Sequence, residues 1–177
     1  MDLIGPFPLG KGQAKYTIVV VDYFTKRAEA EALSTITKAR ITAFIWTSIV
    51  YRFGIPNTIV TDNGKQFDNV KFKDFCSKLG ISHLCSSPAH PKANGQVEAI
   101  NKIIKWGLKL RLDARKRRWV EELPEVLWSY RTTPRESTGE TPFAMAFGSE
   151  AVVPVETGYQ PKGLSTTNKL GMKRSYS

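Results

Sequence analysis

The chain has 177 residues, of which 41% are hydrophobic, and a formal net charge of +10. This length suffices for one domain with a sizeable core, and no apolar run approaches the roughly 20 residues that a membrane-spanning helix needs. The two cysteines provide no disulfide framework, so we expect an intracellular protein with no membrane partner.

The positive charge is concentrated in two segments. Eight Lys or Arg and two acidic residues lie between positions 98 and 118, and residues 161–177 contain four basic residues and no acid. A basic helix and a basic tail favour a polyanionic partner on one face. A solvent-exposed charged helix with no partner has the same composition.

The first part of the chain predicts three closely joined strands. A short segment carrying Asp2 opens the chain as a strand. Residues 15–23 form a β-branched run after a glycine turn, which predicts a buried strand. Residues 28–33 alternate small or apolar with acidic side chains, and the short link before them predicts an edge-like strand antiparallel to the second.

Strands and helices then alternate. Strands are predicted at 57–61 and 81–85, a loop at 86–95, and helices at 37–53, 67–79, 96–112, 119–130 and 141–147. This order predicts an α/β fold in which a mixed sheet of five strands is flanked by helices. Residues 157–177 contain few large apolar side chains, and we expect a disordered tail there.

Three carboxylates have the spacing and surroundings of a metal site. Asp2 closes the first strand, Asp62 follows the fourth, and Glu98 begins the basic helix with 35 residues between it and Asp62. Mg²⁺ takes oxygen ligands and retains several waters, so three carboxylates can hold two ions. The charge of the ions would offset the mutual repulsion of the carboxylates.

The residues around these acids resemble a known family. The segments are Asp-Leu-Ile-Gly-Pro-Phe-Pro, Thr-Asp-Asn-Gly, His-Pro-Lys-Ala-Asn-Gly-Gln-Val-Glu and Tyr-Arg-Thr-Thr-Pro. Together with the acid spacing, they resemble the D,D-35-E catalytic core of retroviral integrases and, more specifically, of gypsy-type long-terminal-repeat retrotransposons. The resemblance runs from Asp2 to about Glu156.

This resemblance implies a ribonuclease H-like fold and a polynucleotidyl transferase, with residues 1–156 as the catalytic core. We expect that core to be truncated at its N-terminus, because the chain begins one residue before Asp2. The implied cofactor is a pair of Mg²⁺ (or Mn²⁺) ions held by Asp2, Asp62 and Glu98. The implied reactions are 3′-end processing and strand transfer. The implied partners are DNA, as element ends and target, and further copies in a homodimer or higher oligomer, with the nucleus as the location.

The predicted DNA-contacting residues surround the acids. On the helix at 96–112, Lys102, Lys105 and Lys109 share a face with Glu98 and lie away from an apolar stripe that includes Ile100. An intrahelical pair between Glu98 and Lys102 would explain part of this pattern without DNA. The resemblance adds further DNA-positioning candidates, namely Asn63, His90, Asn94, Gly95 and Asn101.

Other interpretations remain open from the sequence. Asp22 also ends a strand, but its neighbours predict a turn at Asp22–Thr25. Cys76, His83, Cys85 and His90 lack the paired spacing of a zinc site. A catalytically silent DNA-binding or self-associating remnant is one alternative function. A ribonuclease H-type nuclease is another, because it shares the fold.

Overall fold

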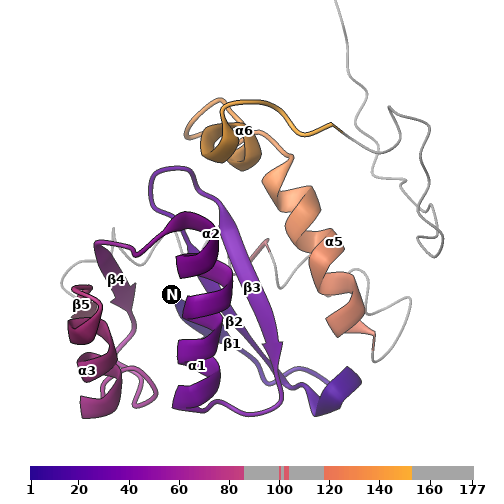
Figure 1. The fold of residues 1–177 in the computed structure, drawn as a ribbon. Helices are drawn as coiled ribbons and strands as arrows, with labels where there is room; N and C mark the ends of the chain where they lie inside the picture. The colour runs from indigo at the N-terminus through magenta and orange to yellow at the C-terminus, as the bar shows by residue number, and fades with distance from the viewer. Residues whose placement is uncertain (86–99, 101, 104–117, 153–177) are drawn as a thin grey trace, which may run out of the picture.

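A computed structural model of the chain describes residues 1–85, 100, 102–103 and 118–152 (Figure 1). Its strands are β1 (Asp2–Ile4), β2 (Tyr16–Val21), β3 (Ala28–Leu33), β4 (Thr58–Thr61) and β5 (Ser82–Cys85). Its helices are α1 (Lys38–Phe44), α2 (Tyr51–Phe53), α3 (Val70–Lys78), α5 (Trp119–Arg131) and α6 (Pro142–Phe147), with a 3-10 turn η1 (Lys11–Gln13) and a π-helical segment η2 (Ile45–Val50). The predicted α/β composition is confirmed. Within these residues, no helix is long and apolar enough to cross a membrane.

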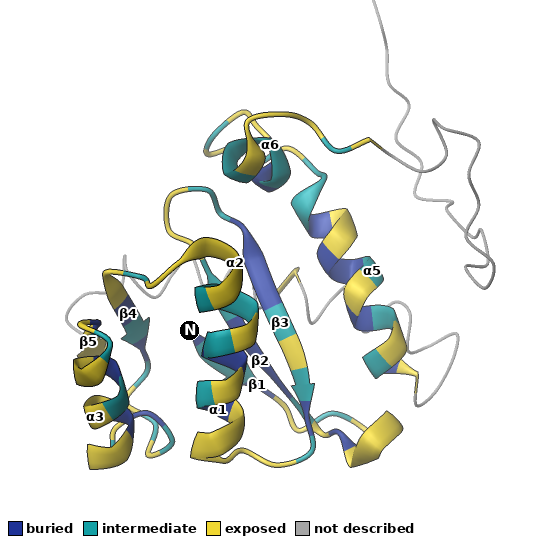
Figure 2. Cartoon of the chain, viewed as in Figure 1, coloured by how far each residue is buried: buried dark blue, intermediate teal, exposed yellow. Residues whose placement is uncertain are grey.

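The strands β1, β2 and β3 form an antiparallel sheet that is covered on both faces. Asp2 of β1 lies opposite Val19, and residues 16–21 of β2 pair along the whole of β3. Successive side chains of a strand point to opposite faces. Accordingly, Ile18 enters the core cluster shared with α1, whereas Val19 enters the cluster shared with α5. Figure 2 shows buried positions along β2 and β3 between these helices.

The helix that covers the first face runs from Lys38 to Phe53 through α1, η2 and α2. It begins where the Thr37 side chain accepts a hydrogen bond from the backbone N–H of Arg40. It ends at Gly54, whose φ of 87° is a conformation that other residues rarely adopt. Ile41 and Phe44 are completely buried against the sheet. The predicted helix at 37–53 is therefore confirmed, with a π-helical middle that the periodicity did not indicate.

The strands β4 and β5 are parallel and are connected through α3. The helix α3 begins at Val70, three residues later than predicted, because the Asn69 side chain accepts the backbone N–H of Phe72 and caps the helix there. Phe67 precedes the cap but is completely buried and packs its ring against Phe72, with centroids 5.7 Å apart. The predicted helix therefore included Phe67, an apolar residue that lies outside α3.

The prediction of one five-stranded sheet was wrong for the described residues, because β1, β2 and β3 form one sheet and β4 and β5 another. Joining them would require successive backbone hydrogen bonds between β1 and β4. β1 has only three residues, and the contact at this point is made by the Met1 amino group, which donates to the Val60 carbonyl oxygen at 2.6 Å. Apolar packing joins the sheets instead, since Ile18 and Ile59 belong to one core cluster.

The helix α5 covers the second face of the three-stranded sheet (Figure 1). Trp119 is completely buried at its start, and the indole N–H donates to the Pro8 carbonyl oxygen at 2.8 Å. Near its end, the Tyr130 hydroxyl donates to the Lys26 carbonyl oxygen at 2.7 Å. The following α6 is capped by Thr141 and begins with Pro142. The predicted helices at 119–130 and 141–147 are both present.

A buried carboxylate ties β3 to the helices on either side. Glu29 of β3 accepts from Arg27 at 2.9 Å, from Arg52 of α2 at 2.8 Å and from Arg131 of α5 at 2.6 Å. Its side chain is 7% exposed. The Arg27 guanidinium also lies over the Phe147 ring of α6, 4.7 Å from its centroid. We call Glu29 and these three arginines the Glu29 junction.

Candidate active site

Asp2 lies on the strand β1, where pairing with β2 fixes its backbone. Its carboxylate oxygen Oδ1 accepts the backbone N–H of Leu3 at 2.7 Å. The residue is half-buried, next to a fully paired strand on one side and β4 on the other. Asp2 is therefore held at the boundary between the two sheets.

Asp62 follows the last residue of β4 and lies in a turn. Its Oδ1 accepts the backbone N–H of Gly64 at 3.1 Å, a short-range contact that aspartate commonly makes at turns. Asn63 between them is exposed. The turn chemistry of Thr-Asp-Asn-Gly thus ends the strand and fixes one carboxylate oxygen of Asp62. It also leaves the Asn63 side chain accessible for the positioning role that the sequence predicts.

The structure brings the segments of Asp2 and Asp62 together, because the Met1 amino group, next to Asp2, donates to the carbonyl oxygen of Val60, two residues before Asp62, at 2.6 Å. Burial lowers the pKa of the Met1 amino group to about 6, while the charges of Asp2 and Asp62 act in the opposite direction. Carboxylates influence an amine in this way when they are near it. The two segments that carry these acids, 60 positions apart in the sequence, therefore meet where β1 lies beside β4.

This pair of carboxylates is a suitable donor set for a hard divalent cation, because Mg²⁺ prefers oxygen ligands and needs few of them from protein. Within the residues that the structure describes, no three His, Cys, Asp or Glu side chains cluster as a metal site. Glu98, the third predicted ligand, lies outside those residues.

Most of the predicted DNA contacts also lie outside the described residues. These are Lys105, Lys109, His90, Asn94, Gly95 and Asn101. Of the predicted basic helix, Ile100, Lys102 and Ile103 are described and are helical. Ile100 is 6% exposed and joins the core cluster of α5, whereas Lys102 is exposed. The predicted division between an apolar stripe and a lysine face is observed at these two residues.

The Asp22 side chain stabilises a turn, as the sequence predicts. Its Oδ2 accepts both the backbone N–H of Thr25 at 2.9 Å and the Thr25 hydroxyl at 2.6 Å. The Asp22 backbone pairs with Arg27 across the link between β2 and β3. These contacts close the hairpin connection, which explains why an aspartate follows β2.

A contact next to Asp62 was not anticipated from the sequence. The Thr61 hydroxyl lies 2.9 Å from His83 Nε2 and donates to the Asp62 carbonyl oxygen at 2.9 Å. Thr61 and His83 come from neighbouring strands, β4 and β5. Their separation of 22 positions carries no motif. Only the pairing of β4 with β5 in the structure reveals that the two side chains meet.

Comparison with known structures identifies the fold. The fold is that of retroviral integrase cores. The simian T-cell lymphotropic virus intasome, solved with a PP2A regulatory subunit, matches 94% of this chain and 59% of its own chain with a TM-score of 0.70 and 21% identity. The HTLV-2 integrase catalytic core domain, solved with magnesium in a trimeric form, matches 80% of this chain and 99% of its own with a TM-score of 0.61 and 24% identity.

Sequence comparison gives the family. The integrase core domain family matches residues 1–91, and the chain belongs to that family. The feline leukemia virus Gag-Pol polyprotein is 35% identical over 136 residues, covering 76% of this chain and 8% of the polyprotein. The avian reticuloendotheliosis virus Gag-Pol polyprotein is 32% identical over 164 residues, covering 92% of this chain and 14% of the polyprotein. The chain thus spans a small part of these relatives.

Proposed function

We propose that this chain is the catalytic core of an integrase from a gypsy-type retrotransposon, acting in the nucleus on element ends and target DNA. Its reactions would be 3′-end processing and strand transfer by phosphoryl transfer, in a homodimer or higher oligomer. The observation that supports this most directly is that the residues next to Asp2 and Asp62, on two separate sheets, are in contact, with the Met1 amino group donating to the Val60 carbonyl oxygen at 2.6 Å. The basic segment at 98–118 supports DNA as the partner.

In this proposal Asp2, Asp62 and Glu98 hold two Mg²⁺ or Mn²⁺ ions. When bound, the ions supply activation of the attacking water or DNA 3′-hydroxyl and stabilise charge on the leaving oxygen. The Gly64 N–H keeps one oxygen of Asp62 fixed, so its carboxylate is oriented before a metal arrives. Lys102, which is exposed, would bind the DNA phosphates together with Lys105 and Lys109 and position the scissile bond.

Turnover of branched DNA in Mg²⁺ or Mn²⁺ tests the proposal. The wild-type chain should process the substrate, while Asp62→Asn and Glu98→Gln should abolish turnover. DNA affinity measured in chelator should stay unchanged or rise slightly, because one negative charge near the DNA is lost. DNA binding without metal-dependent turnover in the wild type would favour the silent remnant. Preferential cleavage of an RNA–DNA hybrid would favour the ribonuclease H alternative.

The lysine face has its own test. Replacing Lys102 and Lys105 together with Ala should remove two phosphate contacts and reduce the slope of log K against log[salt] by about 1.8. The double variant Lys38→Ala, Lys71→Ala removes the same charge from exposed positions on other elements and should leave the slope nearly unchanged. An unaltered slope in the first variant would place the DNA elsewhere, for example on the Arg115–Arg118 cluster.

A further inference from the structure

The Thr61 hydroxyl connects His83 and Asp62, which are distant from each other in the sequence. It is 1% exposed, and its hydroxyl lies 2.9 Å from His83 Nε2 on one side and 2.9 Å from the Asp62 carbonyl oxygen on the other. A buried hydroxyl needs hydrogen-bond partners, because leaving it without any costs free energy. The chain His83–Thr61–Asp62 supplies both partners next to the candidate metal ligand.

The number of hydrogens available to the His83–Thr61–Asp62 contacts determines which group donates in each hydrogen bond. A threonine hydroxyl has one hydrogen, and here it is donated to the Asp62 carbonyl oxygen. The contact with His83 is then satisfied when Nε2 carries a hydrogen and donates it to the Thr61 oxygen. If Nε2 had no hydrogen, Thr61 would turn its own toward the ring and release the Asp62 carbonyl oxygen. Both contacts of the Thr61 hydroxyl can therefore form together only in the Nε2–H form of His83.

The surroundings of His83 hold the ring in place. The imidazole meets the Phe72 ring edge-on, with centroids 5.0 Å apart and planes at 84°. Its strand position lies opposite Ile59 in the parallel pairing of β4 and β5. Burial and the Lys73 ammonium lower the pKa of His83, and the Asp68 carboxylate acts in the opposite direction. The ring is thus favoured in the neutral state, with one proton for the contact with Thr61.

We propose that His83 is a positioning residue for Asp62: through the Thr61 hydroxyl it fixes the backbone of Asp62 and hence the direction of the carboxylate toward the metal site. This proposal rests on the proposed function, since Asp62 is taken to be a metal ligand there. Side chains that orient a ligand from behind commonly change metal affinity or activity by about 10- to 100-fold when they are removed.

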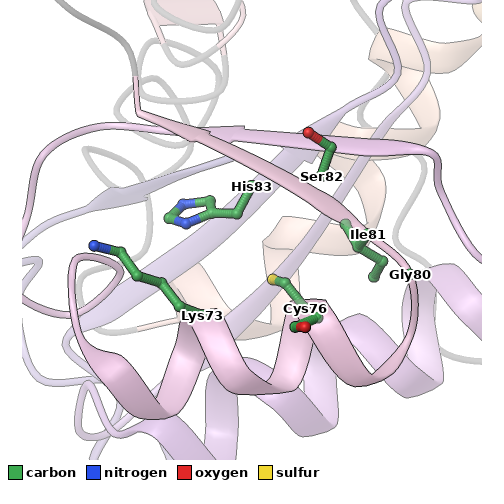
Figure 3. A pocket seen from close by; sticks show the side chains of 7 residues that line it. Lys73, Cys76, Gly80, Ile81, Ser82 and His83 are labelled. Carbon is green, nitrogen blue, oxygen red and sulfur yellow. The ribbon is translucent and has the colours of Figure 1, made fainter.

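His83 can be reached from solvent. It lines an open cleft of about 450 Å³ between α3 and β5, together with Lys73, Cys76, Ser77, Gly80, Ile81 and Ser82. Figure 3 shows the imidazole extending from β5 and the Lys73 side chain coming from α3. Truncating His83 to alanine should therefore connect this cleft to the Thr61 hydroxyl. A free imidazole molecule, which is smaller than the cleft, could then take the place of the side chain.

The test measures Mn²⁺ binding to the full chain by electron paramagnetic resonance, alongside turnover of branched DNA. His83→Leu and Thr61→Val should each weaken Mn²⁺ binding by about 10-fold. Because both remove the same hydrogen bond, the double variant should be no weaker than either single variant. His83→Gln, which keeps an N–H donor, should remain near the wild type. Added imidazole should restore binding to His83→Ala.

Ser82→Ala is the matched control, because Ser82 lines the same cleft on the same strand and has no contact with Thr61 among the hydrogen bonds described. It should bind Mn²⁺ like the wild type. Wild-type affinity in His83→Leu, additive losses in the double variant, or no Mn²⁺ binding by the wild-type chain would overturn the proposal. If His83→Leu does not fold, Thr61→Val and the imidazole experiment give the same decision. Mn²⁺ binding that depends on His83 in a chain without turnover would refute the proposed function and leave the positioning role intact.

Discussion

Tyr130 is a buried phenol whose environment opposes ionisation. Its hydroxyl donates to the Lys26 carbonyl oxygen, and the Arg135 guanidinium lies 4.1 Å from the centre of its ring. Burial raises the pKa of Tyr130 from 10.0 to about 12, although the Arg135 charge acts in the opposite direction. Because the folded pKa is the higher one, the stabilisation from the neutral phenol is complete below pH 10.0 and is lost as the pH rises through about 12.

Titration of the tyrosinate absorbance checks this. Tyr130→Phe should remove a component that ionises near pH 12 in the native protein. It should also reduce the fall in the free energy of unfolding between pH 10.0 and 12. Tyr51→Phe is the control, since Tyr51 is 75% exposed, and it should leave that component in place. An unchanged titration curve in Tyr130→Phe would contradict the assignment.

At the scale of single residues, the sequence pattern assigned the first metal-binding acid to Asp2 and a turn to Asp22, and the Asp22 turn is confirmed. It did not reveal His83. The reason is physical: the partner of His83 is a threonine on a neighbouring strand, and threonine in a strand is common for its β-branched shape. The contact depends on the register of β4 and β5, which residue types alone do not specify.

Among the elements, α3 depends on one capping side chain. Asn69 Oδ1 accepts the backbone N–H of Phe72 at 2.9 Å, and its amide donates to the Lys65 and Gln66 carbonyl oxygens. Asn69→Ala should lower the free energy of unfolding by about 1 kcal/mol, because the Phe72 N–H loses its side-chain acceptor and keeps only the backbone carbonyl oxygen of residue 69, at 3.1 Å. Urea unfolding should show a lower midpoint with the same slope.

Asn69→Asp separates the two sets of contacts. It retains the cap for α3 but replaces the amide that donates to Lys65 and Gln66. A midpoint close to the wild type would assign the loss in Asn69→Ala to the cap. Equal losses in both variants would assign it to the amide contacts with the preceding turn.

The same element shows where sequence periodicity is limited. The predicted helix began at Phe67, which is as deeply buried as Phe72 but lies before the start of α3. Burial does not require helical backbone, and the asparagine between them sets the true start. For the helix at 37–53, apolar spacing and the Gly54 stop sufficed for its limits. The π-helical segment changes hydrogen bonding within the helix and left no distinct signal in the sequence.

For the molecule as a whole, the Glu29 junction connects the sheet to the helices on both of its faces. Three guanidinium groups share one carboxylate, and Arg27 Nη1 is buried without a hydrogen-bond partner in the described structure. Glu29→Ala would leave buried positive charge uncompensated. We expect the free energy of unfolding to fall by about 3–5 kcal/mol.

The exposed pair Asp74–Lys78 is the control for this variant. These side chains are 53% and 74% exposed, and Asp74→Ala should cost less than about 0.5 kcal/mol. Chemical unfolding of both variants gives the comparison. Equal, small effects would show that the Glu29 junction contributes nothing beyond an ordinary surface pair.

The architecture was predictable in outline from the order of strands and helices. The pairing between sheets was not, because it depends on how many backbone groups of β1 reach β4, and the described contact there is a terminal amino group. Which strand residues share a face of the sheet was predictable, because side chains alternate between the two faces along a strand. Ile18 and Val19 of β2 separate into different core clusters as that rule requires.

The separation of the sheets has a consequence for how a bound metal would affect the protein. Asp2 and Asp62 belong to different hydrogen-bonded units, so local opening between the units can part the carboxylates while both ladders remain intact. A divalent ion held by both acids would therefore be a cross-link, favouring the closed arrangement by about 2.7 kcal/mol at a hundred times its dissociation constant. Amide exchange in β1 and β4 should slow on addition of Mg²⁺ in the wild type and not in Asp62→Asn, so that mechanical coupling of the two sheets reports metal binding without any reaction.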